Sequence, residues 1–405
     1  MEKLKDTEHD FSSKLRQDSA LQRLKEYISW QRECDGDPFD QGFPMFSPVS
    51  INLDLTSACN FSCPFCVDSK LINSRKSLDS KEVMKTIDTL QAHGLLSVIL
   101  IGGGEPTLHK NFDEIVRYVK RKGLQIGIVT NGSRLEKVEG VVDVLQEKDW
   151  IRISIDAADE RTFKGLHHPK TEVTLSRVLG RAKKVKEKNP VVSLGYSFVI
   201  VWEGVEVHGK RLSPNIDEMA RSAELAKEFS FDYISFKPCL VRVEESNRET
   251  LLKGVEKKKE EEIIDQIKER LKEAEEFVGG DLKILQSSNL KAMLSRETDQ
   301  IKRQPKRCHM QFFRTVVTPF GIFHCPAFRG VEEAKIGESE GYRSGAKFRE
   351  TLKKTAQSIW TFDAAAECKH VGCFYNQTNW WLEKFIDSEK EVDQIKKVED
   401  DNFFL

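Results

Sequence analysis

The sequence predicts an α/β fold, in which a parallel sheet with helices between its strands is followed by a smaller α+β segment rich in cysteine. Between residues 51 and 237, short apolar stretches alternate with amphipathic helical stretches. This alternation is typical of strands joined by right-handed crossover helices. Further along, four of the nine cysteines lie between residues 308 and 373, which predicts a second unit with its own chemistry.

The strands are expected where apolar and β-branched residues are concentrated, and the helices where apolar residues recur on one helical face. Asp79 and Ser80 have the composition of a helix N-terminus. Strands are expected at 51–56, 96–101, 124–130, 150–156, 191–201 and 232–237, and helices at about 80–93, 111–122, 134–148, 171–188 and 217–229.

Five segments are expected along the chain. Phe11 to Trp30 predicts a helix in an N-terminal arm that packs on the outside of the barrel. Ile263, Ile267, Leu271 and Ala274 recur at helical spacing within a charged stretch, which predicts an amphipathic helix with one solvated face. Gly279-Gly280 is expected to end this helix. The segments are 1–48 (the helical arm), 49–240 (the main α/β unit), 241–300 (a helical connector that includes this helix), 301–378 (the cysteine-rich α+β domain) and 379–405 (a helix and tail).

Composition narrows the class of protein. Lys and Arg number 64 and Asp and Glu 65, a net charge of −1, so no overall basic field points to nucleic acid or to an anionic membrane. No apolar run approaches the roughly 20 residues of a membrane-spanning helix, and the first residues lack the apolar core of a signal peptide. A cytoplasmic protein is expected, where cysteines favour metal binding over disulfides.

The first constellation is Cys59, Cys63 and Cys66, with spacing C-x3-C-x2-C, directly after the first expected strand. Thiolates suit iron–sulfur clusters or zinc. A closed structural site normally has four protein ligands, so three on one loop would leave a coordination position open. Taken alone, this spacing also fits a zinc knuckle.

A second motif follows the second expected strand. Residues 98–107 read Val-Ile-Leu-Ile-Gly-Gly-Gly-Glu-Pro-Thr, an apolar run that is typical of a buried parallel strand. The glycines after it would let the backbone approach a ligand closely.

Together, the C-x3-C-x2-C motif and Gly103-Gly104-Glu105-Pro106 resemble those of the radical S-adenosylmethionine (radical SAM) superfamily. The resemblance implies a partial (β/α)6, TIM-like barrel, in which the three cysteines bind a [4Fe–4S] cluster and SAM chelates its fourth iron. It also implies that Phe65 lies close to the adenine and that residues 103–106 meet the amino end of SAM. A flavodoxin- or ferredoxin-type electron donor is expected as a partner.

The C-terminal ends of parallel barrel strands are where ligands bind. Asn131 could reach a carboxylate or ribose there, or could form a plain turn. Alternation places Arg152, Ser154 and Asp156 on one face of their strand, and the resemblance assigns Ser154 and Asp156 to the methionine carboxylate and ribose of SAM. His167-His168-Pro169 is typical of a solvated loop, with a role at the substrate as the alternative.

Lys237 and Cys239 end the last expected strand and are candidate catalytic residues on the substrate side. A thiol there could return a hydrogen atom, as in the radical SAM peptide epimerases. The alternative for Cys239 is a buried thiol without a ligand. Apolar residues of 191–201 could flank adenine or simply form the core.

The cysteine-rich segment predicts a second metal site. Residues 315–323 indicate a hairpin that would bring Cys308 and Cys325 together, and Cys368 and Cys373 share a short loop, so the four fit one closed all-thiolate site. This order resembles the twitch domain, the shortened relative of the SPASM domain, and implies one auxiliary [4Fe–4S] cluster. Structural zinc, with His309, His324 or His370 as substitute ligands, is the alternative. The aromatic residues Phe374, Tyr375, Trp380 and Trp381 are expected to pack against the barrel.

The resemblance implies an enzyme, either an oxidoreductase or a transferase- or isomerase-like one, that cleaves SAM to a 5′-deoxyadenosyl radical. The radical would take a hydrogen atom from the substrate for oxidation or rearrangement. The expected substrate is a small polar metabolite of the sugar or aminocyclitol type, in natural-product biosynthesis, with the auxiliary cluster accepting an electron. One alternative is a ribosomal-peptide maturase that crosslinks or epimerises a peptide. The other is a non-enzymatic zinc-binding protein on a decayed scaffold, against which the complete pair of motifs argues.

Overall fold

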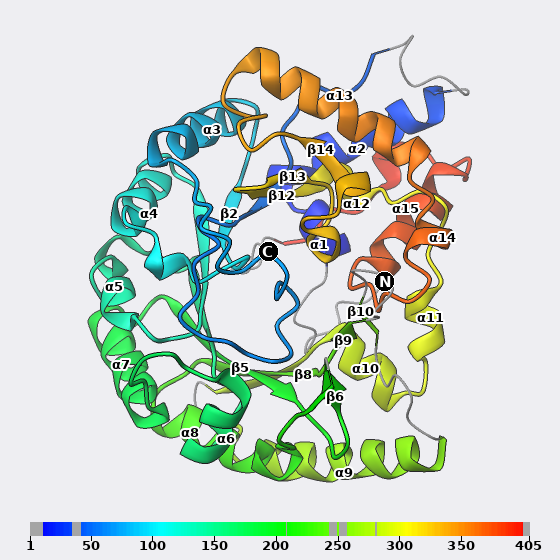
Figure 1. Cartoon of the computed structure of the whole chain (residues 1–405). Helices are drawn as coiled ribbons and strands as arrows, with labels where there is room; N and C mark the ends of the chain where they lie inside the picture. Colours follow the sequence, from blue (N-terminus) through cyan, green and yellow to red (C-terminus); the bar gives the residue numbers. More distant parts are fainter. Residues whose placement is uncertain are drawn as a thin grey trace.

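A curved ten-stranded sheet forms the centre of the protein, and helices cover its outer face (Figure 1). The computed structural model describes residues 11–34, 42–207, 209–242, 249–250, 257–279 and 282–399. The strand order is β11-β8-β5-β4-β3-β2-β1-β12-β13-β14. The strands from β1 to β8 in this order are parallel to their neighbours, which confirms the predicted α/β class.

The six expected strands are all present, with helices between them. The helices begin at capping residues of the predicted kind, for example Asp79, which accepts hydrogen bonds from the N–H groups of Lys81 and Glu82. The strands are β1 (Ser50–Leu53), β2 (Ser97–Leu100), β3 (Gln125–Thr130), β4 (Trp150–Ser154), β5 (Ser193–Ile200) and β8 (Tyr233–Pro238), and the helices are α3 (Ser80–Ala92), α4 (Phe112–Arg121), α5 (Leu135–Glu139), α6 (Glu160–His167), α7 (Leu175–Lys188) and α8 (Met219–Glu228).

Two predicted helices differ from those observed. The helix expected at 134–148 ends at Glu139 and is followed by a 3₁₀ helix, Val142–Val144, where β-branched residues disfavour a longer α-helix. The helix expected at 171–188 begins at Leu175, capped by Thr174. Helix α6 lies before it and was not expected.

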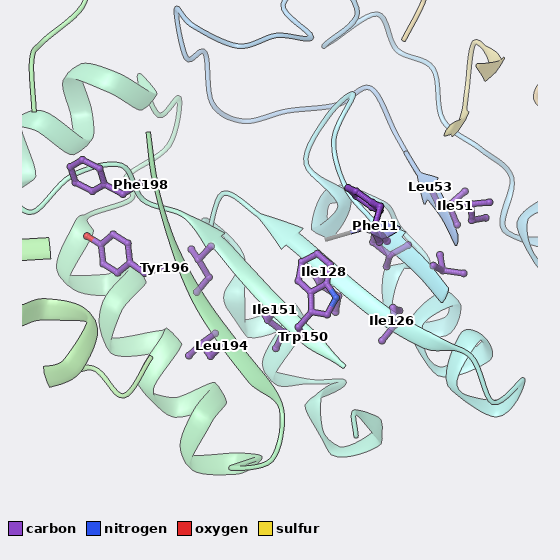
Figure 2. Packing of buried hydrophobic residues seen from close by; sticks show 14 of the residues in the cluster. Phe11, Ile51, Leu53, Ile126, Ile128, Trp150, Ile151, Leu194, Tyr196 and Phe198 are labelled. Carbon is purple, nitrogen blue, oxygen red and sulfur yellow. The ribbon is translucent and has the colours of Figure 1, made fainter. Parts of the chain in front are cut away.

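The two faces of the sheet differ in chemistry. Ile51, Ile128 and Ile151 are fully buried in the main core, as Figure 2 shows for β1, β3 and β4. On the opposite face, which lines the inside of the curve, polar residues such as Asn52, Arg152 and Ser197 alternate with them. The polar face predicted for the fourth strand is therefore confirmed for Arg152 and Ser154.

Helix α1 of the N-terminal arm does not pack on the outside of the barrel, so the prediction is wrong for this part of the arm. All five residues of α1 (Phe11–Leu15) are buried, and Figure 1 shows α1 inside the arc of strands. The Phe11 ring lies edge-on to Tyr375, at 4.7 Å between centroids, and burial of this apolar side chain holds α1 in place. The predicted single helix is broken after Leu15, and α2 (Asp18–Glu33) packs on α15 (Asn376–Ile386).

The connector contains more than its predicted amphipathic helix. That helix is α9 (Lys257–Glu275), and its four predicted apolar residues are buried. A further strand, β11 (Lys283–Gln286), pairs in parallel with β8 and extends the sheet. Gly280, expected to end the helix together with Gly279, lies outside the described residues.

The predicted C-terminal hairpin is confirmed as β12 (Arg314–Thr318) and β13 (Gly321–Phe323). Strand β12 also pairs in parallel with β1, so the cysteine-rich segment continues the main sheet. The remaining elements are β6 (Glu206–Val207), β7 (Lys210–Arg211), β9 (Val241–Arg242), β10 (Glu249–Thr250), α10 (Ser288–Leu294), α11 (Thr298–Lys302), α12 (Met310–Phe313), β14 (Lys335–Gly337), α13 (Gly345–Thr361), α14 (Ala364–Glu367) and short 3₁₀ helices. Within the described ranges, no helix combines the length and the apolar character needed to cross a membrane.

Candidate active site and cluster sites

The three cysteines of the first motif lie together on the loop after β1. Cys59, Cys63 and Cys66 are half-buried free thiols, and the N–H of Cys66 donates to the carbonyl of Cys63 at 3.1 Å. Burial raises the pKa of the Cys63 thiol well above its usual value, and Cys66 and Cys59 raise it further. Burial and the nearby Asp68 raise the pKa of Cys66 to about 12. A bound metal would overcome this cost, because metal binding deprotonates thiols.

The glycine motif after β2 packs directly on the cysteine loop. A Cβ on Gly104 would lie 2.3 Å from the carbonyl oxygen of Thr56 and 2.6 Å from that of Ala58. Next to it, the N–H of Glu105 donates to the carbonyl of Ala58 at 2.8 Å. Only glycine allows this approach, so the two predicted motifs form one structural unit.

The Glu105 carboxylate holds the loops of this unit together. It is 2% exposed and accepts hydrogen bonds from the Thr107 N–H (3.1 Å) and the hydroxyls of Thr107 (2.6 Å) and Thr130 (2.7 Å) on one oxygen. The other oxygen accepts from the Asn131 N–H at 2.7 Å. Burial raises the pKa of Glu105, and these hydrogen bonds oppose the rise. Contact of residues 103–106 with SAM stays a prediction.

Asn131 and Phe65 also lie against the cysteine loop. The Asn131 amide donates to the Asn60 side chain at 3.1 Å and approaches the Cys59 sulfur at 3.9 Å. The Phe65 ring is 6.3 Å from the His167 ring. These contacts position the loop, and the predicted ribose and adenine contacts stay predictions.

A buried network joins the end of β4 to Cys63. Asp156 has φ +57°, a strained conformation for a residue other than glycine, and it accepts from the Val199 N–H at 2.7 Å. Its other oxygen lies 3.5 Å from His167 Nε2, which donates to the Ile155 carbonyl at 2.8 Å. His167 Nδ1 is 3.3 Å from the Cys63 sulfur.

His167 corrects the expectation of a solvated histidine loop. It ends α6 and is 2% exposed. One sequence signal could have predicted helix α6, at whose end His167 lies. It is the capping residue Asp159, whose carboxylate accepts a hydrogen bond from the Thr162 N–H at 2.8 Å. Ser154 is half-buried on the inner face, and its predicted contact with SAM stays a prediction.

Sequence reasoning missed a buried ion-pair group that ties the two cysteine regions together. Arg329, four residues after Cys325, lies 2.6 Å from Asp54 at the end of β1 and 3.1 Å from Asp68, two residues after Cys66. Burial raises the pKa of Asp54, and Arg329 opposes the rise. Removing one partner from such a group leaves an uncompensated buried charge.

The two candidate catalytic residues differ in position. Lys237 is half-buried on the inner face of β8 and acts electrostatically on Asp156. Cys239 has 0% exposure and belongs to the main hydrophobic core. This burial favours the interpretation of Cys239 as a core thiol.

The four cysteines of the second motif come together from separate segments. Cys308, Cys325 and Cys373 pack against one small buried cluster that contains Cys368. Burial raises the pKa of the Cys373 thiol well above its usual value, and Cys308 and Cys325 raise it further. The Asn379 amide lies 3.5 Å from the Cys308 sulfur.

The histidines expected as substitute ligands are placed differently from one another. His309 is occupied on both nitrogens, by the Tyr27 hydroxyl at 2.8 Å and by the Glu383 carboxylate at 2.5 Å. His324 is buried between Phe328 and Phe362, and burial lowers its pKa to about 3. His370 is exposed. Of the expected aromatic patch, Phe374 and Tyr375 pack on Phe11 of the N-terminal helix α1.

The donor sets fit iron–sulfur clusters. None of the nine cysteines forms a disulfide, and they include a group of three on one loop and a group of four in or against one buried cluster. All-thiolate donors are the usual ligands of such clusters. Across the residues that the structure describes, no group of three or more His, Cys, Asp or Glu side chains is placed so that it could hold a metal ion, so the fit rests on the chemistry of the donors.

A parallel sheet that carries a three-thiol loop and a glycine motif at the ends of adjacent strands defines a cofactor-binding α/β protein. Residues 53–205 match the family model of the Radical SAM superfamily, and this part of the chain is a radical SAM domain. The superfamily uses SAM and a [4Fe–4S] cluster. The predicted recognition and the predicted SAM and [4Fe–4S] cofactors of this domain are thus confirmed.

Curated relatives match part of the chain. An S-adenosylmethionine-dependent nucleotide dehydratase of Selenomonas ruminantium is 32% identical over 117 residues, covering 29% of this chain and 42% of the relative. A GTP 3',8-cyclase of Synechocystis is 34% identical over 139 residues, covering 33% and 41%. The chain thus spans about two fifths of the length of these relatives.

Solved structures resemble more of the chain. Streptococcus suis SuiB has a TM-score of 0.55 at 16% identity and covers 89% of this chain and 78% of its own. The structure of anSMEcpe with bound AdoMet and the Cp18Cys peptide has a TM-score of 0.54 at 13% identity and covers 84% and 96%. At this identity the likeness is one of fold, and it extends beyond the radical SAM domain into the C-terminal segment.

Proposed function

We propose that the protein is a radical SAM enzyme with one auxiliary cluster. Cys59, Cys63 and Cys66 would hold the SAM-binding [4Fe–4S] cluster, and Cys308, Cys325, Cys368 and Cys373 the auxiliary one. When bound, SAM and its cluster supply a 5′-deoxyadenosyl radical that removes a hydrogen atom from an unactivated C–H bond, and the auxiliary cluster supplies an electron acceptor. The observation that carries the proposal is the joining of both cysteine regions by the buried Arg329 group.

The chain's own residues would bind and shield the reacting groups. The strand ends and the Gly103–Pro106 backbone would orient SAM. The buried Glu105 carboxylate would hold the surrounding loops together through its hydrogen bonds. Helix α1, buried inside the arc of strands, would exclude water from the interior, which protects a radical from side reactions. A flavodoxin- or ferredoxin-type donor would supply the first electron.

The proposed substrate is a small polar metabolite of the sugar or aminocyclitol type. The inner face of the sheet supports this choice, because it presents Asn52, Arg152 and Ser197, and polar groups lining an interior favour a polar ligand. The nucleotide dehydratase and GTP cyclase among the relatives are named for polar, sugar-containing molecules.

Peptide maturation is the second candidate. It is supported by the fold likeness to SuiB and to anSMEcpe, which were solved with a precursor peptide and the Cp18Cys peptide respectively. Burial of Cys239 in the core disfavours the epimerase version of this candidate, since a hydrogen-donating thiol must reach the substrate.

The testing experiment is iron and sulfide analysis with EPR on anaerobically reconstituted protein. The wild type should hold about eight irons, and the Cys59→Ala/Cys63→Ala/Cys66→Ala variant about four. Cys34→Ala is the matched control and should leave the iron content unchanged. About four irons in the wild type and none in the triple variant, with zinc bound, would refute the auxiliary cluster and its electron-accepting role.

A further inference from the structure

Arg314, the first residue of β12, carries a buried positive charge close to the second cysteine group. It is 8% exposed, and its Nη2 donates to the Asn52 side chain at 2.6 Å. Its Nε has no hydrogen-bond partner among the described residues. The ionisable groups that act on it there are Tyr375, Arg152 and Cys325, none of which is a carboxylate. A buried cation without an anion costs several kcal/mol.

The Phe11 ring links Arg314 to Tyr375. The Arg314 guanidinium lies over this ring, 5.4 Å from its centre, and the ring lies edge-on to Tyr375 at 4.7 Å between centroids. Arg314 begins β12, which pairs with β13, and β13 ends two residues before Cys325. These positions agree with the electrostatic contact between Arg314 and Cys325.

Tyr375 brings a second unsatisfied group to the same place. It lies two residues after Cys373 and is 3% exposed, and its hydroxyl has no hydrogen-bond partner among the described residues. Its phenol acts electrostatically on Arg314, Cys325, Cys373 and Cys308. A buried hydroxyl without a partner costs about 1–3 kcal/mol.

An anion would satisfy both groups, because the Phe11 ring and the Asn52 amide do not neutralise the Arg314 charge, and the neighbouring cysteines can provide one. An oxidised [4Fe–4S] cluster with four thiolates carries about two negative charges, and one more when reduced. The buried site therefore needs a cation and hydrogen-bond donors, and Arg314 and Tyr375 are a cation and a donor that need an anion.

We infer that Arg314 is the counter-cation of the auxiliary cluster and that Tyr375 donates a hydrogen bond into the same site. The inference rests on the auxiliary cluster of the proposed function and goes beyond it. A positive charge and a hydrogen-bond donor both stabilise the more negative, reduced state, so they raise the reduction potential. The two residues thus make the second site an electron acceptor, and they do so as positioning residues that need not touch the substrate.

The test measures the midpoint potential of the auxiliary cluster by EPR-monitored titration, in the Cys59/Cys63/Cys66→Ala background so that only one cluster is present. Arg314→Gln should lower the equilibrium constant for reduction at least about tenfold, which is about 59 mV for one electron. Arg314→Lys keeps the charge and should restore most of the potential. Tyr375→Phe should lower the potential by a smaller amount.

Arg307→Gln is the matched control. Arg307 adjoins Cys308 but is only half-buried, with its guanidinium 5.2 Å from the centre of the Trp360 ring, so solvent partly screens its charge and the change in potential should be clearly smaller than that of Arg314→Gln. An unchanged potential in iron-replete Arg314→Gln overturns the inference. If Arg314→Gln loses iron and Arg314→Lys keeps it, the counter-cation role is supported. If both lose iron, an unchanged potential in Tyr375→Phe overturns the inference. A background protein without iron would instead refute the auxiliary cluster itself.

Discussion

The two cysteine groups are built in opposite ways. Cys59, Cys63 and Cys66 lie on one loop, held by local contacts with the glycine motif of the next strand. The second group comes from three segments: one cysteine lies before α12, one after β13, and two on the loop between α14 and α15. The comparison teaches that the first site depends mainly on local chain geometry, whereas the second exists only when the whole C-terminal segment has folded.

Arg329→Met tests whether the two cysteine regions depend on each other for stability, and it has the largest expected effect. It leaves Asp54 and Asp68 buried without their cation, so the free energy of unfolding should fall by about 3–5 kcal/mol, measured by urea denaturation. Arg343→Met is the control, because Arg343 pairs with Glu82 on the surface at 3.5 Å and should cost at most about 1 kcal/mol. Equal effects of the two substitutions would mean that the regions fold independently.

Gly104→Ala tests whether the first cysteine group depends on local packing against the glycine motif. The new methyl group would lie 2.3 Å from the Thr56 carbonyl, and such overpacking costs about 3 kcal/mol. Iron should be lost from the first site and kept at the second, measured by iron analysis with EPR. Gly180→Ala, in α7 with open space around it, should instead stabilise the protein slightly. Iron loss at the second site alone would contradict this assignment.

Tyr27→Phe tests how far the second cysteine group depends on the N-terminal arm, and it has the smallest expected effect. The N-terminal arm supports the second group through the hydrogen bond between the Tyr27 hydroxyl and His309. Its loss should cost about 1 kcal/mol and weaken iron retention at the second site only, measured by chelator challenge. Tyr118→Phe, which removes a partly exposed bond to Asp88, should leave retention unchanged. Faster iron loss at the first site would argue against this division.

Much of the fold could be predicted because its signals are local. The six parallel strands follow from apolar periodicity, and the hairpin β12–β13 from its turn residues. Helix α6 and strand β11 were not predicted, because short elements carry weak periodic signals. The position of α1 was also missed, since five residues cannot indicate which surface will bury them.

The candidate site likewise has features that local sequence signals predict and features that they do not. The sequence by itself determined the three-thiol loop, the glycine motif and the set of four later cysteines, because spacing along one loop fixes which groups can share a ligand. Tertiary structure alone decided that Arg329 joins Asp54 and Asp68, that His167 reaches Cys63 and that Arg314 comes within electrostatic range of Cys325. These pairs are far apart in the chain, and only the packing of the sheet and its loops brings their charges within range.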